Sequence, residues 1–247
     1  RRVLFRSIRH YIHQHPELSG QEYQTTAFLK ERLEELGIRI LESGLKTGLI
    51  AEIGSGQPVV ALRADIDALP ILEQTNLPYQ SQNPGVMHAC GHDFHQTSLL
   101  GAAALLKEKE EQLEGTVRLI FQPAEEISEG ASDVLATGLL EDVQGIIGFH
   151  NIPQLKAGQL ALNAGAMMAG VEKFKVTVTG VSSHAARPDL GVDTVTAVTT
   201  MVQNLQLLIS RTVSPFETAV LSITHLDVGS TWNVLPKSGY FEGTIRS

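Results

Sequence analysis

The chain is organised around the stretch His88-Ala89-Cys90-Gly91-His92-Asp93-Phe94-His95. It contains the only cysteine of the chain, and an apolar run of helical periodicity follows it at residues 97–107. Thiolate, imidazole and carboxylate groups beside a helix start are the ligands that transition metals bind in proteins. We therefore predict that this stretch forms part of a metal site and that the rest of the chain supplies partners to it.

Short apolar runs that predict strands alternate with helical patterns on both sides of this stretch. Strands are expected at residues 58–63, 116–121 and 145–149, and helices at 97–111 and 130–140. Such alternation is typical of an α/β fold with a mainly parallel sheet flanked by helices. Ligands of parallel sheets gather beyond the carboxyl ends of the strands, so functional side chains are expected directly after these runs.

Side chains of the kinds that metals bind do follow each of the three strands. Asp65 and Asp67 follow the first strand, Glu125 and Glu126 the second, and His150 the third. Because parallel strands end at the same edge of a sheet, we expect these side chains to converge on the 88–95 stretch.

Two roles remain open for most of these groups. Glu125 and Glu126 suit a solvated first turn of a helix. Adjacent carboxylates also suit a division of labour, in which one holds a divalent ion and the other takes a proton from a metal-bound water. Asp67 suits the orientation of a ligating imidazole, whereas Asp65 is expected to pair with a neighbouring arginine or to cap a turn. His150 is either a metal ligand or a hydrogen-bonded core histidine.

Within the 88–95 stretch, Cys90 and His92 are the best candidates for metal ligands. Nucleophilic catalysis by a Cys/His pair is the competing function, but it explains neither the paired glutamates nor a histidine at the end of a strand. Asp93 is predicted to cap the helix that follows. His95 is expected to be a surface residue of the first helical turn or a support for the ligands.

The residues before the sheet predict two helices. Residues 1–13 place apolar side chains on one helical face, which favours an amphipathic helix. Ser19 and Glu22 have the spacing of a capping box, so we expect Ser19 to cap a second helix and Glu22 to reach back to it. Gly37 is expected to end that helix in the left-handed conformation.

The last third of the chain has a different pattern. Its expected order is strand, helix, strand, strand, at residues 171–179, 193–210, 219–226 and 239–245. One-sided alternation favours antiparallel pairing, so we predict a smaller α+β domain of ferredoxin-like type. The domains are assigned as residues 1–168, which would bind metal, and residues 169–247. His184, on a loop, is either a satisfied loop histidine or a substrate contact, and Asn233 offers a directed amide.

Composition narrows the range of partners and compartments. The formal charge of −8 argues against nucleic acid or an anionic membrane as the main partner. A single cysteine makes no intrachain disulfide, so nothing requires an oxidising compartment, and a cytoplasmic location is expected. The apolar runs are far shorter than the roughly 20 residues of a membrane span.

Five segments, in this order along the chain, resemble the aminoacylase-like metal amidohydrolases, a family that includes N-acyl-amino-acid amidohydrolases, hippurate hydrolases and auxin-conjugate hydrolases. They are His15–Leu18, Arg63–Pro70, His88–Asp93, Gln122–Glu126 and Gly148–His150. The resemblance extends over essentially the whole chain, and its second, third and fourth segments are the most specific.

The resemblance implies a site with two divalent metal ions, drawn from manganese, zinc, nickel and cobalt. By motif, the ligand positions fall on Cys90, His92, Glu126 and His150. Glu125 takes the position of the general base and Asp67 that of a carboxylate that supports the metal centre. A metal-bound water would attack the amide carbonyl of a small N-acyl amino acid, and Glu125 would pass the proton to the leaving amine.

The same resemblance makes residues 169–247 an inserted lid that mediates a homodimer and brings His184 and Asn233 to the substrate. Chains of this family are longer and return from the lid with a further ligand histidine, so this chain is expected to be truncated at its C-terminus. The alternatives are a dipeptidase, a deacetylase of an amino-acid biosynthetic intermediate, and a non-catalytic relative that binds metal or ligand.

Overall fold

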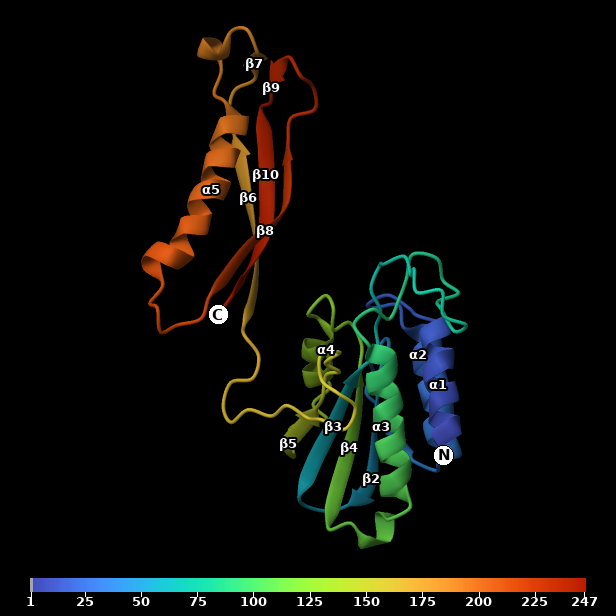
Figure 1. Ribbon diagram of the computed structural model, residues 1–247. Helices are drawn as coiled ribbons and strands as arrows, with labels where there is room; N and C mark the ends of the chain where they lie inside the picture. Colours follow the sequence, from blue (N-terminus) through green and yellow to red (C-terminus); the bar gives the residue numbers. More distant parts are fainter. Residues whose placement is uncertain (1) are drawn as a thin grey trace. The chain divides into compact units, whose positions relative to one another are not determined.

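The computed structural model describes residues 2–247, and the chain divides into two compact units, Arg1–Lys156 and Ala157–Ser247 (Figure 1). The assignment of residues 1–168 and 169–247 to a catalytic domain and a lid stays a prediction. Among the described residues, no helix combines the length and the apolar character that crossing a membrane requires.

A five-stranded sheet in the order β1-β2-β4-β3-β5 forms the centre of the first unit. The strands are β1 Arg39–Leu41, β2 Leu49–Ser55, β3 Val59–Asp65, β4 Gly115–Gln122 and β5 Val143–Gly148. β3 runs parallel to both of its neighbours, β4 and β5, whereas β2 is antiparallel to β1 and β4. The sheet is therefore mixed, and the prediction of a mainly parallel sheet is wrong for its β1–β2 half.

The mixed order follows from the connection between β2 and β3. Only residues 56–58 join these two strands, so the chain reverses and β2 must run against β3. β4 nevertheless lies between them, because a helical crossover returns it parallel to β3. All eight residues of β4 are buried, as expected of a strand covered on both faces.

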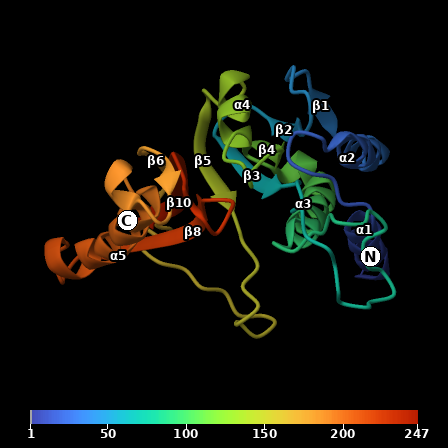
Figure 2. The ribbon, with the colours of Figure 1, turned by 90° about the horizontal axis from the view of Figure 1, so that it is seen from above.

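Three helices cover one face of this sheet and a short fourth helix covers the other (Figure 2). They are α1 Arg2–Gln14, α2 Tyr23–Glu35 and α3 His92–Lys107 on the first face and α4 Gly130–Ala136 on the second. Successive side chains of β4 point to opposite faces of the sheet and so belong to two separate parts of the core. Leu119 and Phe121 pack with α1, α2 and α3, whereas Ile120 packs with Val134 of α4. A 3₁₀ turn, Glu110–Gln112, leads from α3 into β4.

The start of α2 corrects the predicted capping box. Glu22 occupies the N-cap position, but its carboxylate accepts hydrogen bonds from Thr47 Oγ1 at 2.7 Å and from the backbone N–H of Ala124 at 2.8 Å. Ser19 donates its hydroxyl to Asp67 Oδ2 at 2.7 Å and does not accept an N–H of the helix as a cap would. Both side chains thus bind other parts of the fold. Gly37, at φ +67°, ends α2 as predicted.

The second unit has the predicted order of strand, helix, strand, strand. β6 Val171–Thr179, β10 Ser238–Arg246 and β8 Val220–Val228 form an antiparallel sheet in that order, and α5 Thr194–Thr212 packs against it. Asp193 caps α5 by accepting the N–H of Thr196 at 3.0 Å. A small ribbon pairs β7 Ser183–His184 with β9 Val234–Leu235, and a 3₁₀ turn spans Pro188–Leu190. The role of this unit as a lid stays a prediction.

Candidate metal centre

The carboxyl ends of β3, β4 and β5 bring the predicted side chains together beside the start of α3. Nε2 of His92, the first residue of α3, lies 3.6 Å from Asp65 Oδ2, 3.8 Å from Glu125 Oε2 and 3.7 Å from Glu126 Oε1. His150 follows β5 and faces the same point. The predicted convergence of three strand ends is thus present in the first unit.

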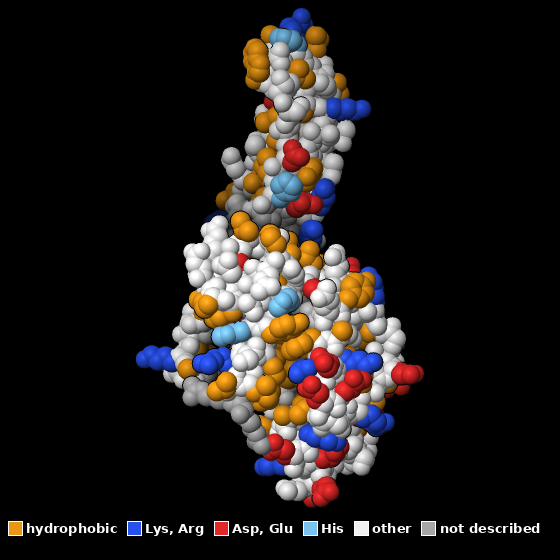
Figure 3. All heavy atoms as spheres, turned by 90° about the vertical axis from the view of Figure 1, so that its right-hand side faces the viewer, with side chains coloured by type: hydrophobic (Ala, Val, Ile, Leu, Met, Phe, Trp, Pro, Cys, Tyr) orange, Lys and Arg blue, Asp and Glu red, His pale blue; other side chains and the backbone are white. Residues whose placement is uncertain are grey.

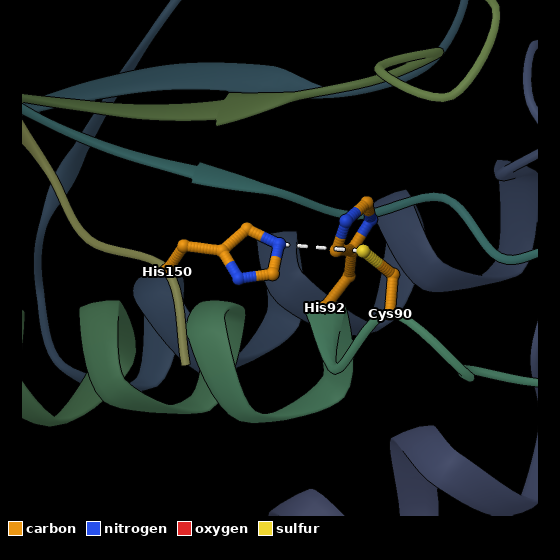
Figure 4. A group of neighbouring side chains, drawn as sticks. All are labelled: Cys90, His92 and His150. Carbon is orange, nitrogen blue, oxygen red and sulfur yellow. Dashed lines mark hydrogen bonds between the residues drawn. The ribbon is translucent and has the colours of Figure 1, made fainter. Parts of the chain in front are cut away.

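Cys90 and His150 complete the cluster from two sides. Cys90 Sγ lies 3.3 Å from His150 Nε2, and Figure 4 shows the His150 ring directed toward both Cys90 and His92. Donor atoms of Cys90, His92 and His150 all lie within 4.8 Å of one another, and so do those of His92, Glu125 and Glu126. His92 belongs to both groups, so they form one continuous set of candidate ligands.

The donor atoms fit divalent cations. His92 Nε2 and Glu126 Oε1 are buried and have no hydrogen-bond partner among the described residues. A buried lone pair that faces three carboxylates is costly unless a cation lies between them. A thiolate, two imidazoles and carboxylates form a donor set suited to zinc and the neighbouring transition metals.

Asp67 fixes the orientation of His92. Nδ1 of His92 lies 2.9 Å from the carbonyl oxygen of Asp67 and 3.2 Å from its Oδ1, so Nδ1–H donates there and Nε2 is left as the candidate ligand atom. Asp67 Oδ2 accepts from Ser19 Oγ and, at 2.9 Å, from the N–H of Glu126. Burial alone would raise the pKa of Asp67, but the hydrogen bonds from His92, Glu126 and Ser19 hold that pKa below its usual value.

The acidic surroundings also shift the groups with candidate chemical roles. Burial, followed by the charges of Glu126 and Asp65, raises the pKa of Glu125 above that of an ordinary glutamate. Burial and the same acidic cluster raise the pKa of the Cys90 thiol to about 12. Near neutral pH a cation is therefore needed to hold Cys90 as a thiolate.

Two expectations for the first turn of α3 are changed by the structure. Gly91, at φ +92°, is the N-cap residue, so the prediction that Asp93 caps α3 is wrong. Asp93 is buried and accepts hydrogen bonds from Arg9 Nε at 2.9 Å and His13 Nδ1 at 3.0 Å. His95 is fully buried and is not a surface residue; its Nδ1 lies 2.6 Å from Asp65 Oδ1.

The sequence analysis missed Ser19 and Asn151. Ser19 supports Asp67, but its spacing from Glu22 suggested a local capping role. Asn151 contacts His95 through its backbone and its side chain. Its position directly after His150, just past the end of a strand, was the only available signal.

The second unit places its two predicted substrate residues near each other. His184 is exposed on β7, and its Nδ1 accepts the N–H of Ala186 at 3.1 Å. The N–H of Ala185 donates to the carbonyl oxygen of Asn233 at 3.0 Å. His184 and Asn233 thus belong to one small ribbon, and their contact with substrate stays a prediction.

The face shown in Figure 3 presents Lys and Arg side chains interspersed with acidic ones. On that face the described residues form no single basic surface. The formal charge of −8 agrees with this distribution.

Comparisons with known proteins relate this site to a family of hydrolases. Residues 61–228 match the model of peptidase family M20/M25/M40. The chain is 49% identical over 242 residues to N-acetyl-L-cysteine deacetylase of Bacillus subtilis, covering 97% of this chain and 58% of the relative. It is 44% identical over 241 residues to IAA-amino acid hydrolase ILR1-like 5 of Arabidopsis thaliana, covering 97% of this chain and 55% of the relative.

A solved structure gives the same relation. The crystal structure of the Bacillus subtilis YXEP protein, described as a dinuclear metal-binding peptidase of the M20 family, superimposes with a TM-score of 0.81 at 44% identity. The match covers 99% of this chain and 64% of that one. The chain thus spans less than two thirds of the length of each of these three proteins.

Proposed function

The chain belongs to peptidase family M20/M25/M40, and from this membership we propose that the protein hydrolyses the amide bond of small N-acyl amino acids with two divalent metal ions. Relatives at 44–49% identity are named for removal of an acyl group from an amino acid. The observation that carries the proposal is the buried, unpaired Nε2 of His92, which faces Asp65, Glu125 and Glu126 at 3.6–3.8 Å.

The ions would be held by the donors that the structure gathers around that nitrogen, namely Cys90, His92, Glu126 and His150. Divalent ions at such a site supply Lewis-acid chemistry, which polarises an amide carbonyl and acidifies water. The mixed sulfur, nitrogen and oxygen donors favour zinc, manganese, cobalt or nickel. Asp67 keeps the His92 ring in the tautomer that leaves Nε2 free.

Glu125 is the general base of the proposal. It is partly exposed, so it can reach substrate and water, and its raised pKa brings it closer to the pH at which proton transfer is most effective. Its carboxylate would take a proton from the attacking water and deliver that proton to the leaving nitrogen. The products are a carboxylic acid and a free amino acid.

The alternative of a cysteine nucleophile is disfavoured by the same surroundings. A nucleophilic cysteine needs a lowered pKa, which neighbouring cations or a helix start provide. Burial, together with the acidic groups around Cys90, instead raises the pKa of its thiol to about 12. This thiol fits a metal ligand better than an attacking group.

Metal analysis of the full-length protein, followed by hydrolysis of acetyl, benzoyl and arylacetyl amino acids, tests the proposal. We expect bound divalent metal and turnover of at least one class. Glu125→Gln should lower kcat by about 10²–10⁴-fold and leave the metal content unchanged, because it removes a base and not a ligand. Absence of both metal and turnover would refute the proposal. Preference for dipeptides or a biosynthetic acetyl compound, or metal binding without turnover, would favour the alternatives.

For the second unit we propose a lid that forms a homodimer and brings His184 and Asn233 to the substrate. The exposure of His184 and its proximity to Asn233 in one ribbon support this role. His184→Ala should raise KM or lower kcat without changing metal content, and sedimentation should give twice the protomer mass. We further propose a cytoplasmic location, which fractionation of the source cells tests.

A further inference from the structure

We propose that Asn151 and His95 are positioning residues that hold His150 against the first turn of α3 with its Nε2 directed at the metal centre. The inference rests on the proposed function, because it takes His150 to be a metal ligand. It concerns how the chain presents that ligand and assigns no chemical step to Asn151 or His95.

His150 requires support from outside its own strand. Among the described residues β5 pairs with β3, and this pairing ends at Gly148, opposite Arg63. His150 lies two residues beyond that last pair and is exposed. Backbone pairing alone therefore leaves its ring free to move, whereas a metal ligand is effective only when it is held in place.

Asn151 connects this segment to α3 by two contacts with one nitrogen. Its backbone N–H donates to His95 Nε2 at 3.0 Å, and its side-chain amide lies against the same edge of the ring. Gly91 admits this amide, since a Cβ atom at Gly91 would lie 2.2 Å from Asn151 Oδ1. The glycine before α3 thus serves the approach of Asn151 as well as the left-handed turn.

The same residue orients the His150 ring. His150 Nδ1 lies 2.8 Å from the carbonyl oxygen of Asn151, so Nδ1–H donates there and Nε2 carries the free lone pair. That Nε2 is the atom directed at Cys90 in Figure 4. The His95 and His150 rings also meet edge to face, with centroids 4.6 Å apart. Phe94 and Phe149 form a similar pair at 5.7 Å.

His95 itself is better suited to support than to ligation. Its Nδ1 contacts Asp65 Oδ1 at 2.6 Å and its Nε2 contacts Asn151, so neither ring nitrogen is left for an ion. Asp65 is in turn held by Arg63 Nη1 at 2.7 Å. The chain Arg63–Asp65–His95–Asn151 therefore runs from β3 through α3 to the residue after His150.

A double-mutant cycle on metal affinity tests the inference in the full-length protein. His95→Phe, His150→Ala and the double variant are titrated with Co²⁺ against a competing chelator. We expect each single change to weaken binding about 10- to 100-fold and the double variant to bind no more weakly than His150→Ala, because the proposal has His95 act through His150. Gln144→Ala is the matched control, since this exposed β5 amide donates to the exposed Gln57 at 3.3 Å, and its loss should leave affinity unchanged.

A second readout needs no metal. Amide hydrogen exchange of the metal-free protein should become faster over residues 149–151 in His95→Phe, which keeps a ring but removes the hydrogen bonds to Asp65 and Asn151. Asn151→Ala keeps the backbone contacts and should give a smaller increase. Should His95→Phe unfold, His95→Leu carries the affinity test in its place.

The inference is overturned if the losses from His95→Phe and His150→Ala multiply in the double variant, or if His95→Phe keeps the affinity of the natural protein. These results leave the proposed function intact as long as the natural protein binds metal and turns over substrate. If the natural protein binds no divalent metal, the proposed function fails first and the inference falls with it.

Discussion

Replacing Ser19 by alanine tests the support of the metal centre at its outer edge. The Ser19 hydroxyl is half-buried and donates to Asp67 Oδ2 at 2.7 Å, and Asp67 is 1% exposed. A hydrogen bond to a charged group contributes about 1.5–3 kcal/mol, and the partial exposure of Ser19 favours the lower end. We expect Ser19→Ala to lower the free energy of unfolding by about 1.5–2 kcal/mol, which is roughly a 10- to 30-fold change in the folding equilibrium.

Urea unfolding of the metal-free protein measures this loss, and Asp67→Ala supplies the control background. If Ser19 acts through Asp67, Ser19→Ala costs little once Asp67 is absent. A helix cap would cost the same in both backgrounds, since capping involves α2 alone. Losses that add within about 0.5 kcal/mol would refute the assignment.

Acid titration gives an independent check on the same variant. The pKa of Asp67 is lowered in the folded protein. Its contribution to the free energy of unfolding is therefore fully present above the ordinary aspartate pKa and is lost as the pH falls through the lowered value. Ser19→Ala removes one of the hydrogen bonds that lower this pKa. The acid loss of stability should therefore be smaller in the variant, and it should be complete at a higher pH than in the natural protein.

Three further predictions concern other parts of the centre. The hydrogen bond to Asp93 outweighs burial and raises the pKa of His13, so the contribution of His13 to the free energy of unfolding is complete below about pH 6.5 and is lost as the pH rises through the raised value. The melting temperature of the natural protein should therefore fall over this pH range, and that of His13→Gln should not. Identical pH profiles of the two melting temperatures would contradict the assignment. Gly91→Ala should lower the free energy of unfolding in urea by at least about 1–2 kcal/mol, because alanine is strained at φ +92° and its Cβ atom would lie 2.2 Å from Asn151 Oδ1. Adding Asn151→Ala should remove the steric clash and restore that part of the loss, but not the part due to backbone strain. Removing metal with a chelator should lower the melting temperature, since metal at 100 times its Kd stabilises by about 2.7 kcal/mol; a transition that the chelator leaves unmoved would argue against a metal bound in the native state.

The position of the site was readable from the sequence because the chemistry lies at strand ends. Asp65, Glu125 and His150 each follow an apolar run, and the geometry of parallel strands brings such positions to one edge. The sequence pattern therefore predicted the convergence without knowledge of side-chain contacts.

The place of β2 in the sheet was not readable in the same way. A short connection to β3 predicts reversal of the chain, but not that β4 enters between the two strands. That insertion depends on which strand edges pair, which is decided by contacts between residues far apart in the sequence.

Local hydrogen-bond rules also failed where tertiary partners competed. Ser19 and Glu22 have the spacing of a capping box, yet Asp67, Thr47 and Ala124 take up their side chains. Asp93 stands at a helix start, yet the partly exposed Arg9 and the buried His13 bind its carboxylate. Capping rules apply when a side chain has no hydrogen-bond partner outside its own helix. At this site such outside partners are present.

The place of β4 between β2 and β3 also has a consequence for synthesis on the ribosome. β3 ends at Asp65 and β4 begins at Gly115, so both flanking strands leave the ribosome well before the strand that joins them. Until then the nascent chain carries two unpaired strand edges, which readily pair with other chains. β4 is fully buried in the folded unit. Because it is synthesised late, the strands that it covers stay exposed in the nascent chain and can bind chaperones.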